Sequence, residues 1–228
     1  MRPTPEWGEP SPQRPALSEH QIAVSRTARY VTAGPAASEA SAVWFALHGY
    51  GHLARRFARQ FRPILDGERL LVVPEALSRF YLDGSRGPIG ASWMTRENRE
   101  AEISDYVRYL DELLKAVAPP NSVPTVVLGF SQGVATACRW ALAGRVRPTR
   151  LILWSGGLPP DLPWPTAAKR LRQTTVVFVN GRADHGLTRS EVTKQRDLLR
   201  AREVASEELW FEGGHELNDE VLVELASR

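Results

Sequence analysis

The sequence predicts an α/β protein with a mostly parallel central sheet and helices on both faces. Short runs of apolar, β-branched residues alternate along the chain with longer segments in which apolar residues recur at helical spacing. The apolar runs contain few polar residues, as expected of strands that are buried on both faces. This alternation is typical of strands laid side by side with helices packed above and below them.

The composition is that of a globular domain. The 228 residues are 43% hydrophobic and 24% charged, and no apolar run approaches the roughly 18 residues that a membrane span requires. The N-terminus lacks the apolar segment of a secretory signal. The single cysteine, Cys138, excludes an intrachain disulfide, so we expect a reducing compartment, the cytoplasm.

The charge balance raises the question of nucleic-acid binding, since the net charge is +3 and the isoelectric point is about 9.3. Acidic and basic residues alternate along the chain, so we expect no nucleic-acid partner. Arg55, Arg56, Arg59 and Arg62 could attract an anionic substrate. A solvated helix face is the simpler interpretation, because these arginines mostly avoid the apolar side of a predicted helix.

The chain divides into a tail and one domain. Residues 1–18 are rich in proline and poor in apolar residues, which predicts a flexible tail, and residues 19–228 are expected to form a single domain. One or two early strands are predicted within residues 21–34. A buried strand at 41–47 leads into a glycine-rich turn.

The remaining elements continue the alternation to the end of the chain. Residues 77–93 are rich in glycine and aromatic residues without a clear period, and we expect a long functional loop there. Further strands are predicted at 69–76, 122–130, 150–157, 174–181 and 205–211, and helices at 53–65, 100–117, 132–144, 189–202 and from about residue 216.

The segment GFSQG, residues 129–133, lies where a predicted buried strand ends and a predicted helix begins. A serine between two glycines in this setting is typical of a nucleophile elbow, a tight turn that holds the serine hydroxyl clear of the backbone. Ser131 is therefore the candidate nucleophile. The N–H of Gln132 would lie at the helix start, where backbone donors lack partners and the helix dipole favours an oxyanion.

A serine nucleophile needs a general base, and the base needs an acid that orients it. Both follow the serine along the chain, the acid first. Asp184 follows a predicted strand and is the favoured acid, although it could instead cap the next helix. His215 follows the last predicted strand in a glycine-containing loop and is the favoured base. The alternative is His185 as the base with Asp161 as its acid.

The second oxyanion donor is expected in the loop after an early strand. Residues 47–51, LHGYG, occupy that place, and the N–H of Tyr50 is the candidate. We interpret His48 as a structural residue that shapes this loop. Cys138 lies on the same predicted helix as Ser131, and we interpret it as a small core residue.

With these residues in place, the sequence resembles the α/β-hydrolases, and among them the phospholipase/carboxylesterase family that includes acyl-protein thioesterases. The matching segments are LHGYG, GFSQG, WSGGLP, NGRADH and GGHE, in this order. The resemblance implies the α/β-hydrolase fold and the hydrolysis of carboxylic esters or thioesters without a metal or another cofactor. It also implies a nucleophile, an acid, a base and two oxyanion donors at Ser131, Asp184, His215, Tyr50 and Gln132.

The resemblance extends to a substrate pocket. Residues 90–94, GASWM, resemble the tryptophan-containing loop that borders the family's acyl pocket. Trp93 and Met94 are therefore candidate pocket residues, with Leu158 facing them. The sequence departs from the family pattern in two places, with HGYGH where H-G-x-G-D is frequent and DHGLT where an apolar residue and a proline often follow the acid. These departures leave the triad intact and affect substrate specificity.

Together these features predict a serine esterase that hydrolyses small-molecule esters of short or medium acyl chain through an acyl-enzyme. Residues 77–94 form no continuous amphipathic helix of the kind that an interfacial lipase uses as a lid. The alternative within this class is a thioesterase acting on acyl-proteins or acyl-CoA. The alternative from another class is a hydrolase-like binding protein without catalysis, although such proteins usually lack a triad residue. The sequence names no oligomeric state.

Overall fold

The structure is a computed structural model, and it describes residues 17–164 and 166–228 of the chain. The strands are β1 (Tyr30–Ala33), β2 (Ala42–Leu47), β3 (Arg69–Pro74), β4 (Ser78–Tyr81), β5 (Ile89–Ser92), β6 (Thr125–Phe130), β7 (Arg150–Trp154), β8 (Thr175–Gly181) and β9 (Ser206–Phe211). The helices are α1 (Ala54–Ala58), the 3₁₀ helix η1 (Arg59–Ile64), α2 (Arg99–Val117), α3 (Gln132–Ala143), α4 (Thr166–Leu171), α5 (Arg189–Arg200) and α6 (Asp219–Ser227).

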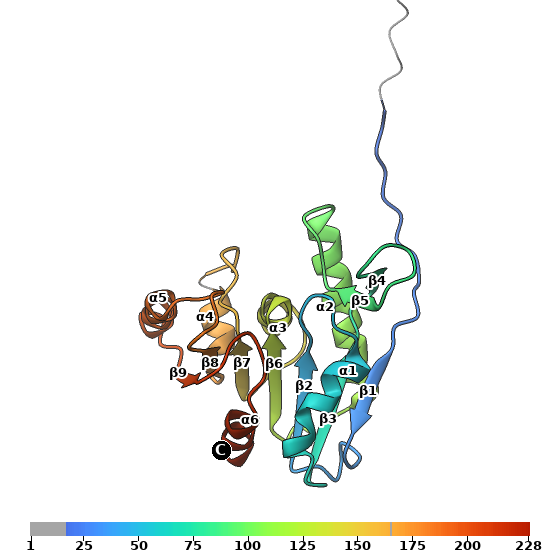
Figure 1. Cartoon of the computed structure of the whole chain (residues 1–228). Coiled ribbons are helices and arrows are strands. Elements are labelled where there is room, and N and C mark those ends of the chain that lie inside the picture. Colours follow the sequence, from blue (N-terminus) through green and yellow to red (C-terminus); the bar gives the residue numbers. More distant parts are fainter. Residues whose placement is uncertain (1–16, 165) are drawn as a thin grey trace, which may run out of the picture.

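The central sheet has seven strands in the order β1-β3-β2-β6-β7-β8-β9 (Figure 1). Strand β1 pairs antiparallel with β3, and the other neighbours in this sheet pair parallel. Strands β4 and β5 form a separate antiparallel hairpin. The mostly parallel α/β architecture predicted from the sequence is therefore confirmed.

Helices cover both faces of the sheet, so that each face carries its own apolar core (Figure 1). One core packs the sheet against α2, α3, α4 and α5, and the other packs it against α1, η1 and α6. Strand β2 supplies both, because successive side chains point to opposite faces. Val43 and Phe45 enter the first core, while Trp44 and Ala46 enter the second. This two-sided burial explains why the strands are almost entirely apolar.

Residues 77–93, predicted as a loop, contain the β4–β5 hairpin. The prediction of an irregular loop was wrong because the two strands are short and the exposed residues of β4 alternate with half-buried ones. Gly84 adopts a φ of +52° in the connection between the strands, a conformation that suits glycine. The hairpin gives this segment a fixed backbone beside the sheet edge.

Three other elements differ from the prediction. Of residues 21–34, only Tyr30–Ala33 form a strand. The predicted helix at 53–65 changes from α to 3₁₀ geometry at Arg59, since Pro63 has no N–H to continue the α-helical hydrogen bonds. The helix α4 was not predicted, and its Thr166–Leu171 segment is too short to show a clear period.

The predicted tail, residues 1–18, lies mostly outside the described residues. Residues 17–29 form neither a helix nor a strand, and the segment runs as an extended trace (Figure 1). They contact the domain through the Gln21 side chain, which donates to Asn98 at 2.7 Å, and through the carbonyl oxygen of Arg29, which accepts from the Tyr109 hydroxyl at 3.1 Å. Among the described helices, none combines the length and the apolar composition needed to cross a lipid bilayer.

The core of the sheet should be sensitive to truncation. Phe178 lies at the centre of β8 and is fully buried, so Phe178→Ala is expected to lower the free energy of unfolding by about 3–5 kcal/mol through lost burial and a residual cavity. Urea unfolding followed by circular dichroism measures this change. The control Val223→Ala, on the exposed side of α6, should change the free energy by less than about 0.5 kcal/mol. Equal effects of the two variants would contradict the described core.

Candidate active site

Ser131 lies between the end of β6 and the start of α3 in a strained backbone conformation, with φ 54° and ψ −117°. A left-handed φ is uncommon for a residue with a side chain and tends to occur at functional sites. The two glycines around it are required by close packing. A Cβ on Gly129 would lie 2.4 Å from the carbonyl oxygen of Gly133, and a Cβ on Gly133 would lie 2.2 Å from that of Leu47. Neither position therefore has room for a side chain.

Trp154, the last residue of β7, connects Ser131 to the loop that carries His215. The N–H of Ser131 donates to the carbonyl oxygen of Trp154 at 2.9 Å. The indole Nε1–H of Trp154 donates to the carbonyl oxygen of Glu216 at 2.8 Å. Sequence reasoning treated Trp154 only as part of a strand, because nothing in a strand pattern signals a hydrogen bond to a distant loop.

Asp184 and His215 lie together at the carboxyl edge of the sheet. Nδ1 of His215 and Oδ2 of Asp184 are 2.9 Å apart, while Oδ1 of Asp184 accepts from the N–H of Gly186 at 2.9 Å. The side chain of Asp184 is only 5% exposed, whereas that of His215 is 47% exposed. Burial alone would raise the pKa of Asp184, but the Gly186 N–H, the nearby Ser155 hydroxyl and His215 together hold it below its ordinary value. The carboxylate therefore stays ionised beside the imidazole.

The loop that carries His215 folds back over the end of β8. A Cβ on Gly181 would lie 2.4 Å from the carbonyl oxygens of both Gly213 and Gly214. The N–H of Ala183 donates to the carbonyl oxygen of Gly213 at 2.9 Å. The imidazole then contacts the ring of Phe130, the residue before Ser131, with 5.1 Å between ring centroids. These contacts bring His215 to the elbow.

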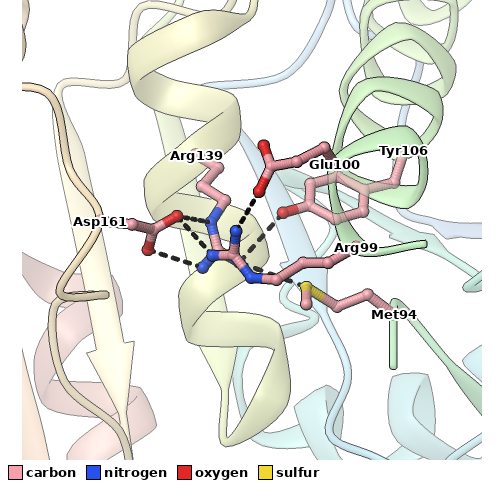
Figure 2. A network of polar contacts seen from close by, with 6 residues as sticks. All are labelled: Met94, Arg99, Glu100, Tyr106, Arg139 and Asp161. Atoms are coloured by element: carbon pink, nitrogen blue, oxygen red, sulfur yellow. Dashed lines mark hydrogen bonds and ion pairs between the residues drawn. The ribbon is translucent and has the colours of Figure 1, made fainter. Parts of the chain in front are cut away.

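The alternative acid, Asp161, belongs to a different polar network (Figure 2). Its carboxylate accepts from Nη2 of Arg139 at 2.9 Å and from Nη2 of Arg99 at 2.5 Å. The hydrogen bonds from Arg139 and Arg99 hold the pKa of Asp161 well below its usual range, against the opposing effect of burial. His185 is exposed and adjoins Asp184. The structure therefore brings Asp184 to His215 and does not bring Asp161 to His185.

Residues 48–53, which contain the candidate oxyanion donor Tyr50 and are called the oxyanion loop below, lie beside the elbow. A Cβ on Gly49 would lie 3.3 Å from the Cβ of Ser131, so the backbone of this loop passes close to the candidate nucleophile. Within the described residues, no hydrogen bond joins the N–H of Tyr50 to another group. Gln132 is the first residue of α3, and the first N–H groups of a helix have no partner within it. Both donors proposed from the sequence thus have N–H groups available near Ser131.

The β4–β5 hairpin braces the oxyanion loop. The N–H of Gly51 donates to the carbonyl oxygen of Ala91 at 2.9 Å, and the N–H of Ala91 donates to that of His52 at 3.2 Å. Gly90 is so close to the loop that a Cβ would lie 2.6 Å from the carbonyl oxygen of Gly51. The ring of Tyr50 packs on that of Phe80, with centroids 5.0 Å apart.

The Gln132 side chain holds residues 92–94 against α3. Its Oε1 accepts from the N–H of Trp93 at 3.1 Å, and its Nε2 donates to the carbonyl oxygen of Met94 at 2.9 Å. Trp93 is 3% exposed, and its indole N–H donates to the carbonyl oxygen of His48 at 2.8 Å, so this side chain supports the oxyanion loop. Met94 and Leu158 are half-buried. The pocket roles of Trp93, Met94 and Leu158 stay predictions.

His48 is fully buried, and burial lowers its pKa to about 4. Its Nε2 lies 3.1 Å from the N–H of Ala76 and accepts that bond, so Nδ1 carries the proton and donates to the carbonyl oxygen of Gly49 at 2.8 Å. His48 is therefore a neutral residue that shapes the oxyanion loop. Nearby, the ring of His52 stacks on that of Phe130, with centroids 5.9 Å apart. Burial lowers the pKa of His52, and the neighbouring Arg56 and His215 lower it further.

A strained serine at a strand–helix elbow, with an aspartate–histidine pair at the same edge of a mostly parallel sheet, is the architecture of an α/β-hydrolase. Comparison with known families narrows this class. The model of the phospholipase/carboxylesterase family matches residues 29–226. The chain belongs to this family, and the resemblance found in the sequence is confirmed.

Solved structures agree on the fold. Acyl-protein thioesterase 2 from Zea mays is 21% identical with a TM-score of 0.66, and the match covers 88% of this chain and 97% of that one. A phospholipase/carboxylesterase from Dyadobacter fermentans is 18% identical with a TM-score of 0.64, and the match covers 90% of this chain and 97% of that one. The Bacillus cereus carboxylesterase is 16% identical with a TM-score of 0.65, and the match covers 88% of this chain and 92% of that one. A comparison with curated protein sequences finds no match.

The buried His48 makes stability depend on pH. Because its folded pKa of about 4 lies below the unfolded value of 6.5, the unfolded chain binds a proton in this window that the folded protein does not. Stability is then fully present above the unfolded pKa and is lost as the pH falls toward the folded one. Replacing the titrating imidazole by His48→Gln should shrink the difference in unfolding free energy between about pH 7 and pH 4.5 by about 2 kcal/mol.

Urea unfolding at the two pH values measures this difference. The exposed His185 supplies a matched control for loss of an imidazole outside the core, and the change in His48→Gln should exceed that in His185→Gln. An unaltered pH dependence in His48→Gln would show that His48 does not resist protonation in the folded protein.

Proposed function

We propose that the protein is a serine esterase that hydrolyses small-molecule carboxylic esters of short or medium acyl chain. The observation that carries the proposal is the Asp184–His215 pair, 2.9 Å apart, at the sheet edge where Ser131 occupies a strained elbow. Membership of the phospholipase/carboxylesterase family supports the reaction class. The proposed compartment is the cytoplasm, in keeping with the single buried thiol of Cys138.

In the proposed mechanism, Nε2 of His215 takes the proton of the Ser131 hydroxyl as its oxygen attacks the ester carbonyl. Asp184 holds the Nδ1–H of His215 and stabilises the imidazolium that forms. The N–H groups of Tyr50 and Gln132 donate to the oxyanion, a contribution typically worth a factor of about 10²–10³ in kcat for each donor. His215 returns the proton to the leaving alcohol, and water then hydrolyses the acyl-enzyme by the same steps.

Several features bear on the substrate. The half-buried Met94 and Leu158 offer apolar surface for an acyl chain. Residues 77–94 form a short hairpin with its connections instead of the amphipathic lid helix of an interfacial lipase. A thioesterase acting on acyl-proteins or acyl-CoA is the second candidate, favoured by the structural likeness to an acyl-protein thioesterase. The two differ only in the leaving group, so a panel of matched esters and thioesters separates them.

The roles of the triad residues can be tested by substitution. Ser131→Ala and His215→Ala are each expected to abolish hydrolysis of p-nitrophenyl esters while the protein stays folded, because triad residues act as a unit. Asp184→Asn should lose much of the rate, whereas Asp161→Asn should retain it. Steady-state kinetics and labelling of Ser131 by a fluorophosphonate probe provide the measurements.

Two results would count against the assignment. If Asp161→Asn were inactive and Asp184→Asn active, the acid would be wrongly assigned. If the wild-type protein neither hydrolysed esters nor reacted with the probe, it would be a non-catalytic binding protein with a hydrolase fold.

Acyl chain length should affect the rate in a characteristic way. Each buried methylene contributes about 0.8 kcal/mol, so kcat/KM should rise from acetate along the p-nitrophenyl ester series until the pocket is full and then fall. Leu158→Ala should shift the optimum to longer chains while activity remains. Trp93→Ala is less suitable for this test, since Trp93 also holds His48. A jump in rate on emulsified palmitate would instead indicate an interfacial lipase.

A further inference from the structure

The oxyanion loop is held at both ends by two consecutive residues that follow β3. At its start, Nε2 of His48 accepts from the N–H of Ala76 at 3.1 Å. Immediately after its end, the N–H of Ala54 donates to Oε2 of Glu75 at 3.1 Å. Glu75 and Ala76 therefore fix the two ends of the backbone segment that contains the N–H of Tyr50.

Of the residues that hold the oxyanion loop, Glu75 is the one with a buried carboxylate. Its side chain is only 3% exposed, and a buried carboxylate is stable only when it is paired and hydrogen-bonded. Arg29 supplies the pairing in a two-pronged contact, with Nε 2.5 Å from Oε1 and Nη2 2.9 Å from Oε2. Arg79 is more distant, with 3.7 Å from its Nη1 to Oε1.

Arg29 is itself fixed through its backbone. Its carbonyl oxygen accepts from the N–H of Glu75 at 3.0 Å and from the hydroxyl of Tyr109 on α2 at 3.1 Å. Oε2 of Glu75 is thus shared between the guanidinium of Arg29 and the N–H of Ala54. These contacts join the segment before β1, the end of β3 and the start of α1 at one buried carboxylate.

We propose that Glu75, paired with Arg29, is a positioning residue that holds the Tyr50 N–H in place to stabilise the oxyanion. The inference rests on the proposed function, since it takes Tyr50 as an oxyanion donor. A preorganised donor acts only where charge develops in the transition state, and small displacements of a catalytic group cost much of its effect. Loss of the Glu75 carboxylate should therefore lower kcat and leave KM nearly unchanged.

The test compares four variants of the full chain. Glu75→Ala removes the acceptor and the charge, whereas Glu75→Gln keeps an oxygen for the Ala54 N–H and loses the ion pair. Arg29→Met removes the hydrogen-bonded partner. Arg79→Met is the matched control, because it deletes an arginine whose ion pair with Glu75, at 3.7 Å, includes no hydrogen bond. Melting curves establish folding, and kcat and KM are measured on a p-nitrophenyl ester. The inhibition constant of a trifluoromethyl ketone, whose adduct with Ser131 carries an oxyanion, provides the second readout.

The expected result is a fall in kcat of about ten- to a hundredfold for Glu75→Ala, below the loss typical of a whole donor, and a similar weakening of the ketone. Arg29→Met should follow in the same direction, Glu75→Gln should recover part of the loss, and Arg79→Met should equal the wild type. If Glu75→Ala does not fold, Arg29→Met and Glu75→Gln decide the question by the same two readouts.

Two results would overturn this inference and leave the proposed function standing. In the first, the wild type is active and the Glu75 and Arg29 variants have the same kcat and inhibition constant as Arg79→Met. In the second, the Glu75 and Arg29 variants raise KM and leave kcat unchanged. A wild type that hydrolyses no ester but reacts with a fluorophosphonate probe moves the comparison to the rate of labelling, with the same order of variants expected. A wild type inert to both esters and probe would overturn the proposed function and this inference together.

Discussion

The close approach of α3 to the end of β2 is the constraint on which the site depends. Gly133 lies against the carbonyl oxygen of Leu47 with no room for a Cβ, so the helix begins directly beside the loop that follows β2. That contact brings the start of α3 and the oxyanion loop close together, and a Cβ on Gly49 of this loop would lie 3.3 Å from the Cβ of Ser131. The strain at Ser131 is then held by the strand before it and the helix after it.

Around this contact, most supporting hydrogen bonds come from segments far apart in the sequence. Trp154 joins the elbow to the loop of His215, and Trp93 joins the β5 end to His48. The Gln132 side chain fixes residues 92–94 against the start of α3. Side chains whose rotamers are fixed in this way can hold a catalytic geometry without large movements.

The sequence predicted the buried strands and the positions of Asp184 and His215, because strands buried on both faces are nearly uniform in composition and their ends meet at one edge. It did not predict the β4–β5 hairpin, whose strands are too short for their alternation to stand out. The contacts of Glu75 could not be predicted either. These contacts come from Arg29, in the segment before β1, and from Ala54, at the start of α1. No local sequence pattern predicts a contact between residues so far apart in the chain.

Arg29 lies one residue before β1, so a residue outside the first strand contributes to the buried ion pair with Glu75. A protease that cut the chain between Arg29 and Tyr30 would leave every strand of the sheet complete. It would remove the hydrogen-bonded counter-ion of a buried carboxylate. The fragment would look intact by its secondary structure, and yet the buried carboxylate at the end of the oxyanion loop would keep only the more distant Arg79 as a counter-ion, at 3.7 Å. An ion pair upstream of the point where regular structure begins is therefore an integral part of this fold.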